Sequence, residues 1–414
     1  MAPSDNFRID RQRLWDSLME MARIGPGVAG GNNRQALTPE DAEGRRLLAS
    51  WCEAEGLSMA IDEMGNMFAR RAGTEPHLPP VMVGSHLDTQ PTGGKYDGVL
   101  GVLAALELVR RLNEAEIRTR HPIEIVNWTN EEGSRFAPSM TGSGVFAGII
   151  PRDEAYCIED AEGVKLGTAL EQAGFLGDVP CSPRPIHAFF ELHIEQGPLL
   201  EKEGLDIGVV THGQGLRWIE FTLTGKEAHT GSTPMEDRLN AGLGMARIIE
   251  RVHQIALANA PDGRGTVGHF DVSPNSRNIV AAEAVFTADV RHPDRDTLFA
   301  MERMLESDAR AVAEELGLEL AMKNVGASDP VAFDSACVSA VRAAAERLGL
   351  DHRNIVSGAG HDACFIADIA PTAMVFCPCI GGLSHNEAEE ITPEWAAAGA
   401  NVLMHAVLEM AEVV

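Results

Sequence analysis

Short apolar runs alternate with longer stretches of helical periodicity along this 414-residue chain. Stretches such as 98–113 and 391–412 carry apolar residues three and four positions apart, which predicts helices. Strands that alternate with helices indicate an α/β fold with a mostly parallel sheet. The short runs that end abruptly in polar residues, and so are typical of buried strands, are 81–83, 123–128, 189–193 and 372–376.

Residues 212–327 show a different order of elements. The expected elements are strand 216–223, helix 240–258, strands 266–272 and 278–291, helix 296–316 and strand 318–324. This β-α-β-β-α-β order is typical of a small α+β sandwich. We therefore expect a first domain formed by residues 1–211 and 328–414, interrupted by an inserted domain over 212–327.

The charge and the N-terminus restrict the partners and the compartment. The chain has 34 Lys and Arg against 61 Asp and Glu, a net charge of −27. Nucleic-acid binding depends on basic residues that neutralise phosphates, so we expect no nucleic-acid partner. No apolar run approaches the ~18 residues of a membrane span, and the charged N-terminal stretch lacks the apolar core of a signal peptide. We expect a cytoplasmic protein with no membrane partner.

Polar residues that bind metals or protons gather where the predicted strands end. In open α/β sheets, ligands bind outside the carboxyl ends of the strands, so these side chains should meet at one edge. This set comprises His86 and Asp88 after the first run, Asp97 eleven residues after His86, Glu131 and Glu132 after the second, His193 at the end of the third, and His385 in a loop beyond the fourth.

Imidazole and carboxylate ligands without a thiolate suit zinc, manganese, cobalt or nickel. The set is large enough for two divalent ions if Asp97 bridges them, and two ions can activate one water and polarise a carbonyl together. Asp88, two residues beyond His86, is placed to accept the free ring N–H of that histidine. The adjacent Glu131 and Glu132 divide naturally into a general base and a ligand.

Seven stretches in order along nearly the whole chain resemble the M20 metallopeptidase clan, specifically its hydantoinase/carbamoylase branch. The long spacing between GSHLDT and GGKYDG and the HIEQGP motif separate this branch from the peptidases of the clan. The resemblance implies a di-metal catalytic domain with an inserted lid and dimerisation domain. The matching stretches are GSHLDTQPTGGKYDGVLGVLAALE (84–107), NWTNEEGSRFAPSMTGSGVFAG (127–148), FFELHIEQGPLLE (189–201), GLRWIEFTLTGKEAHTGSTPM (215–235), NSRNIV (275–280), SGAGHDA (357–363) and LSHNEAE (383–389).

The resemblance also implies how the two divalent ions are held. His86 and His193 would bind one ion, Glu132 and His385 would bind the other, and Asp97 would bridge them. Zinc is the first expectation, with manganese, cobalt or nickel as alternatives.

Further roles follow from the same resemblance. Glu131 matches the general base, and Gln196 matches a residue that holds the substrate amide. Asn278 and Arg291 match a pair that grips the substrate carboxylate, for which the planar fork of arginine is well suited.

A histidine of the inserted domain completes the implied site. His229 matches a residue that reaches toward the scissile carbonyl, commonly from the partner subunit of a homodimer formed through the inserted domain. The family more often shows HAGTTPM, so Thr230 and Ser232 depart from its pattern beside the site.

The function implied is hydrolysis of the carbamoyl C–N bond of an N-carbamoyl amino acid, of the α-L or β-alanine type, to the amino acid, ammonia and carbon dioxide. An allantoate or ureidoglycolate amidohydrolase remains open, because these small substrates share a ureido group and a carboxylate. An aminoacylase or peptidase of the clan is a further alternative, against which the HIEQGP context of His193 argues. A non-catalytic scaffold is disfavoured because the ligands and the base are all intact.

Overall fold

The computed structural model describes residues 6–414, which divide into two compact units. The first unit comprises the chain through Thr211 together with Ala332–Val414, and the second is His212–Val331. The expected inserted domain ended at residue 327, within strand β12 (Glu319–Ser328), and the second unit includes all of that strand and three further residues.

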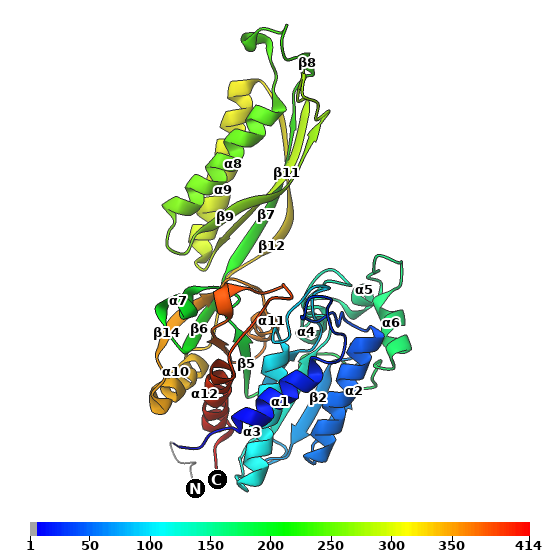
Figure 1. Cartoon of the computed structure of the whole chain (residues 1–414), viewed down its shortest axis with the longest axis vertical. Coiled ribbons are helices and arrows are strands. Elements are labelled where there is room, and N and C mark those ends of the chain that lie inside the picture. The colour runs from blue at the N-terminus through cyan, green and yellow to red at the C-terminus, as the bar shows by residue number, and fades with distance from the viewer. Residues whose placement is uncertain (1–5) are drawn as a thin grey trace. The chain divides into compact units, whose positions relative to one another are not determined.

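A nine-stranded sheet forms the centre of the first unit within the described residues (Figure 1). Its four central strands, β4, β3, β5 and β15, are parallel, and β1, β2 and β6 run antiparallel to their neighbours. The prediction of a mostly parallel α/β sheet is confirmed, and the four apolar runs are its central strands. In spatial order the strands are β1 (Ser58–Ile61), β2 (Met67–Arg71), β4 (Ile123–Trp128), β3 (Val81–His86), β5 (Ala188–Ile194), β15 (Thr372–Cys377), β6 (Ile207–Gly213) and β13 (Val331–Ala332), with β14 (His352–Ser357) beside β6.

Helices cover both faces of this sheet. A Cβ at Gly399 of α12 would meet the Leu192 side chain at 2.6 Å, so glycine allows the helix to lie against β5. On the opposite face, the neighbouring residue Glu191 accepts a hydrogen bond from Ala363 N of α11. The helices are α1 (Arg11–Met21), α2 (Pro39–Ala54), α3 (Val99–Glu114), α4 (Thr141–Phe146), α5 (Arg152–Tyr156), α6 (Leu166–Ala173), α7 (Leu199–Glu203), α10 (Ser335–Leu348), α11 (Asp362–Ile366) and α12 (Pro393–Ala411), with a 3₁₀ turn at Ile380–Gly382.

The predicted helices 98–113 and 391–412 are α3 and α12, and both are buried along most of their length. Their apolar composition reflects packing in the centre of the unit, between the sheet and neighbouring helices. Among the residues that the structure describes, none of the helices is both long enough and apolar enough to cross a membrane.

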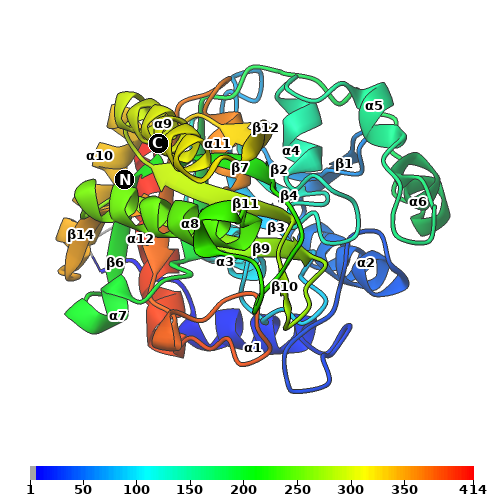
Figure 2. The same ribbon diagram turned by 90° about the horizontal axis from the view of Figure 1, so that it is seen from above.

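The second unit is a four-stranded antiparallel sheet with two helices on one face. Figure 2 shows α8 and α9 lying side by side across it. Phe221 and Phe286 are Cα partners on adjacent strands, and their rings stack in the core with centroids 5.2 Å apart. In spatial order the strands are β12, β7 (Gly215–Thr224), β11 (Glu283–His292) and β9 (Arg264–Ser273), and the helices are α8 (Ala241–Ala258) and α9 (Arg295–Leu316), with a 3₁₀ turn at Met235–Asp237.

The single strand predicted over 278–291 is wrong. Strand β11 begins at Glu283, and the preceding residues form a short strand β10 (Ile279–Val280) that pairs with β8 (Ala228–His229). The strand is interrupted at the two residues between β10 and β11. There Ala281 O accepts a hydrogen bond from Ala241 N, and Ala282 O accepts one from Gly225 N. The β8–β10 ribbon lies beyond the end of the sheet (Figure 1).

Candidate active site

Three parallel strands place the candidate metal-binding and catalytic side chains at one edge of the first unit's sheet. His86 is the last residue of β3, His193 is the penultimate residue of β5, and Glu131 follows β4 by three residues. Asp97 lies in the loop before α3, next to Gly98. Gly98 has a φ of 68°, and a Cβ there would lie 2.3 Å from the His86 ring, so this position requires glycine.

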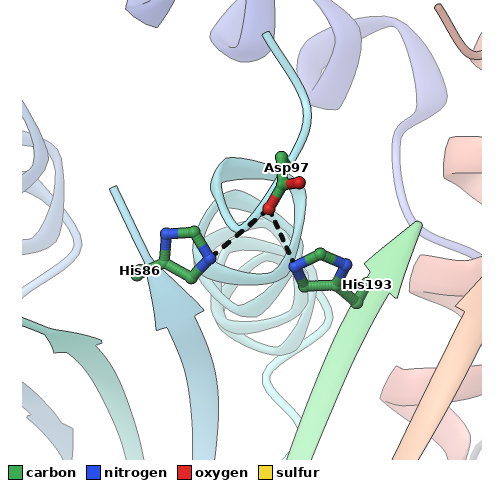
Figure 3. A group of neighbouring side chains, drawn as sticks. All are labelled: His86, Asp97 and His193. Carbon is green, nitrogen blue, oxygen red and sulfur yellow. Dashed lines mark ion pairs between the residues drawn. The ribbon is translucent and has the colours of Figure 1, made fainter. Parts of the chain in front are cut away.

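His86, Asp97 and His193 form the first candidate metal group (Figure 3). Asp97 Oδ1 lies 3.1 Å from His193 Nε2 and 3.5 Å from His86 Nε2, and all three residues are buried. Burial opposes ionisation of Asp97, but the two imidazoles outweigh it and hold the pKa of the carboxyl well below its ordinary value.

Asp97, Glu132 and His385 form the second group. His385 Nε2 lies 3.3 Å from Glu132 Oε2 and 3.7 Å from Asp97 Oδ2. Burial, together with the charge of Asp97, raises the pKa of Glu132 to about 8. Asp97 thus directs one oxygen to each group, as a bridging ligand would.

The tautomers of the two buried histidines fit a cation in the first group. His86 Nδ1 is 2.9 Å from Asp88 O, and His193 Nδ1 is 3.0 Å from Ile194 O. A carbonyl oxygen only accepts, so each Nδ1 carries a proton, and in the neutral ring each Nε2 then has a lone pair to offer, which in His193 accepts the Gly98 N–H at 3.2 Å. His86 Nε2 is buried and has no hydrogen-bond partner within residues 6–414. Lone pairs and a carboxylate oxygen that converge on one point suit a divalent ion.

The Asp88 carboxylate does not make the expected hydrogen bond with the His86 ring. Its backbone carbonyl accepts from the His86 ring, while Asp88 Oδ1 lies 3.8 Å from His86 Nδ1. The carboxylate instead accepts the backbone N–H groups of Glu131, at 3.3 Å, and Glu132, at 3.2 Å. The loop after β3 turns the carbonyl toward the imidazole, so Asp88 positions the two glutamates.

Glu131 belongs to neither metal group. It is buried, and its Oε2 lies 3.4 Å from His86 Nε2. Burial raises its pKa well above the ordinary value, and the charges of Asp362 and Glu132 add to this shift. A carboxylate beside the metal groups that is not itself a member of either can accept a proton.

Gln196 lies against the shared carboxylate. Its Nε2 donates to Asp97 Oδ2 at 2.7 Å. Because a carboxylate only accepts, the amide nitrogen faces Asp97 and leaves Oε1 on the other side. This Oε1 is buried and accepts no hydrogen bond from any residue described, so it can receive an N–H group of a bound molecule.

The other three predicted site residues, His229, Asn278 and Arg291, lie in the second unit, at two separate places. Asn278 O accepts a hydrogen bond from Thr230 N, so Asn278 and the exposed His229 lie together on the β8–β10 ribbon. Arg291 lies near the far end of β11 and pairs with Asp289 at 2.7 Å. The β8–β10 ribbon and Arg291 therefore lie at separate places within the second unit.

Comparison with known proteins supplies the family. A model of the peptidase family M20/M25/M40 matches residues 82–409. An N-carbamoyl-L-amino-acid amidohydrolase from Rhizobium meliloti is 60% identical over 413 residues, which is 100% of this chain and 99% of the relative. The chain belongs to the M20 family. It is a metal-dependent hydrolase that acts on C–N bonds of linear amides.

Two further relatives place this M20 enzyme in the hydantoinase/carbamoylase branch. An amidase of that family from Burkholderia multivorans superimposes with a TM-score of 0.95 at 54% identity, and the match covers 98% of each chain. The allantoate amidohydrolase of Escherichia coli is 36% identical over 398 residues, which is 95% of this chain and 96% of the relative.

Several residues of the M20 site were missed by sequence reasoning. Gln90 donates to Glu132 Oε2 at 2.7 Å, and Glu389 accepts the backbone N–H of Asp97 at 3.1 Å. His361 lies with its ring centroid 4.5 Å from that of His193, and its buried Nε2 has no hydrogen-bond partner in the described part of the chain. The motifs SGAGHDA and LSHNEAE contained two of these residues, but spacing alone gave them no role.

His361 also forms a third candidate group, with Glu191 and His193. Glu191 accepts hydrogen bonds from Ser85 Oγ at 2.6 Å and from Ala363 N at 3.0 Å. Because His193 already belongs to the first group, this third group is part of the same centre.

Proposed function

We propose that this protein hydrolyses the carbamoyl C–N bond of an N-carbamoyl amino acid, of the α-L or β-alanine type. Water and the ureido compound would give the free amino acid and carbamate, and carbamate would break down to ammonia and carbon dioxide. The observation that carries the proposal is the pair of candidate metal groups that share Asp97, with Glu131 beside them and the buried Gln196 Oε1 without a hydrogen-bond partner among the described residues. The Rhizobium meliloti relative, 60% identical and named for this activity, supports it.

We further propose that two divalent ions occupy the two groups, zinc first and manganese, cobalt or nickel as alternatives. When bound, such ions lower the pKa of water and polarise a carbonyl. Glu131 would then act as the general base and general acid. It takes the proton of the attacking water and delivers it to the nitrogen that leaves with the amino acid.

Gln196 can orient the ureido group. Its free Oε1 would accept an N–H of the carbamoyl nitrogen, while its Nε2 stays on Asp97. An ester or a tertiary amide offers no such N–H, so this contact favours ureido and secondary amide substrates.

His229 is suited to stabilise the negative oxygen that forms during attack. Its Nδ1 accepts the backbone N–H groups of Gly231, at 3.0 Å, and Ser232, at 3.2 Å. In the neutral ring the proton therefore resides on Nε2, which is a donor available to a developing oxyanion.

The active assembly is proposed to be a homodimer formed through the second unit. In it His229 and Asn278 of one chain would serve the metal groups of the other, and Arg291 would bind the substrate carboxylate. The separation of the β8–β10 ribbon from Arg291 supports this arrangement, since one copy of the unit brings only one of these sets to a small substrate.

The test is a substrate screen of the protein loaded with zinc, manganese, cobalt or nickel, which measures ammonia release from ureido compounds and free amino acid from amide controls. Substrates are N-carbamoyl-L-α-amino acids, their D forms, N-carbamoyl-β-alanine and allantoate, with an N-acetyl amino acid and a dipeptide as amide controls. Glu131→Gln is the matched inactive control. Turnover of N-carbamoyl amino acids above the other compounds supports the proposal, and hydrolysis of only the dipeptide or the acetyl compound, seen as free amino acid, contradicts it.

Allantoate amidohydrolysis is the second candidate. The 36% identity to the Escherichia coli enzyme, over nearly the full length of both chains, favours it over other ureido substrates. Ureidoglycolate shares the same groups and belongs with this alternative. A kcat/KM for allantoate above that for every N-carbamoyl amino acid would replace the first proposal with this one.

A further inference from the structure

The Glu389 side chain joins two loops that carry candidate metal ligands. It is 3% exposed, and its Oε1 accepts the backbone N–H groups of Tyr96 and Asp97, each at 3.1 Å. Its Oε2 lies 3.1 Å from Ser384 Oγ. Ser384 Oγ in turn lies 2.7 Å from Asp97 Oδ2. Glu389 therefore contacts the backbone of Asp97 directly and its carboxylate through one hydroxyl.

The same short segment also carries a ligand of the second group. His385 follows Ser384, and Glu389 lies four residues further on. Asp97 must keep one oxygen toward His193 and the other toward His385, so rotation or displacement of its side chain would break one group or both.

The loop that bears Asp97 has room for this contact only because residue 94 is glycine. A Cβ at Gly94 would lie 1.9 Å from one carboxylate oxygen of Glu389 and 2.5 Å from the other. Gly94, the second glycine of GGKYDG, thus allows the buried Glu389 carboxylate to lie against the loop and reach the N–H groups of Tyr96 and Asp97.

We propose that Glu389 is a positioning residue that fixes Asp97 between the two metal groups and couples it to the His385 loop. The inference rests on the proposed metal centre. Partners that orient a metal ligand typically change metal affinity 10–100-fold when they are removed. Glu389→Ala should therefore weaken binding of divalent ions by about that factor.

The experiment measures metal binding rather than turnover. Metal-free protein is titrated with Zn²⁺ or Mn²⁺ against a competing chelator, which gives the number of ions and their dissociation constants. Glu389→Gln is the conservative variant, because its amide oxygen can still accept both backbone N–H groups and its nitrogen can donate to Ser384 Oγ. Glu390→Ala is the matched control, since Glu390 is exposed in the same loop and its loss removes an equal charge.

We expect tight binding in wild type, Glu389→Gln and Glu390→Ala, and weakened binding in Glu389→Ala. Wild-type dissociation constants in Glu389→Ala would overturn the proposal, and so would an equal loss in Glu389→Gln, because charge and not position would then be at work. If Glu389→Ala does not fold, Ser384→Ala removes the hydroxyl that links Glu389 Oε2 to Asp97 Oδ2 and that also accepts from Gln196 Nε2, and unchanged metal binding in that variant overturns the proposal.

Asp97→Asn separates this failure from failure of the metal centre. If Asp97→Asn binds both ions as tightly as wild type, the proposed centre is wrong whatever Glu389 does. If Asp97→Asn loses metal while Glu389→Ala does not, the centre stands and the positioning role falls.

Discussion

Mixed dimers of inactive variants should regain activity in a pattern set by the second unit. Strand β11 carries Glu283 next to the β8–β10 ribbon and Arg291 eight residues further on. At ~3.3 Å per residue, Arg291 lies roughly 26 Å from Glu283. The carboxylate and ureido groups of an N-carbamoyl amino acid lie within about two residue lengths of each other, less than about 7 Å. One copy of the unit therefore cannot bring both the ribbon and Arg291 to one substrate.

The variants are His229→Ala, Asn278→Ala, Arg291→Lys and Glu131→Gln. In a mixed dimer of His229→Ala with Glu131→Gln, one site receives an intact ribbon from its partner and keeps its own Glu131. Random exchange in an isologous dimer makes half of the dimers mixed, each with one intact site, so activity should approach about a quarter of wild type. A mixture of His229→Ala with Asn278→Ala should stay inactive, because both changes lie on the same ribbon. His229→Ala with Arg291→Lys should recover when substrate is held far below the raised KM of Arg291→Lys, where that variant alone has little activity.

The assay measures ammonia release after subunits are exchanged by dilution and reconcentration, with exchange proven by mass-tagged chains. Each variant alone gives the baseline, and wild type mixed with each variant gives the upper limit. Recovery between His229→Ala and Asn278→Ala would show that the ribbon does not act as one element. No recovery with Glu131→Gln, despite proven exchange, would place His229 in the site of its own chain or outside the chemistry.

Four further outcomes are expected. Glu131→Gln should retain both ions by elemental analysis and lose ~10²–10⁴-fold in kcat, and a parent rate would show that the base is misassigned. Arg291→Lys should raise KM for the free carboxylate and not for its amidated analogue, since lysine lacks the planar fork, and an equal rise for both would contradict that role. Removal of divalent ions by a chelator should abolish turnover, with recovery on adding zinc or manganese back. Arg45→Met removes the buried ion-pair partner of Asp41, which lies 2.7 Å from Arg45. The free energy of unfolding, measured by denaturant titration, should fall by about 3–5 kcal/mol. A loss below ~1 kcal/mol would contradict the importance of this ion pair.

The parallel centre of the sheet was predictable because its strands are buried on both faces. Such strands consist of continuous apolar residues, and the four runs in the sequence mark β3, β4, β5 and β15. The flanking strands were not assigned because their sequences are mixed. Strand β1 is partly exposed and contains no continuous buried run.

The candidate metal groups were predictable because the carboxyl ends of parallel strands meet at one edge. This rule brings His86, Glu132 and His193 together without any knowledge of the loops. The hydrogen-bond partners of these residues could not be predicted in the same way, because the loop conformation decides whether a backbone carbonyl or a side chain contacts an imidazole ring. The Asp88 carboxylate and carbonyl both lie near His86, and only the structure shows which one makes the contact.

The departures at Thr230 and Ser232 from the family pattern can be judged from the same distinction. Thr230 contributes its backbone N–H to Asn278 O, and Ser232 contributes its backbone N–H to His229 Nδ1. Neither contact depends on the side chain, so replacing the more usual residues leaves the ribbon and the imidazole tautomer in place. The donor on His229 Nε2 is thus determined by the path of the backbone after β8. A change that alters that path, such as proline at Gly231 or Ser232, should reduce the role of His229 far more than any change of side chain there.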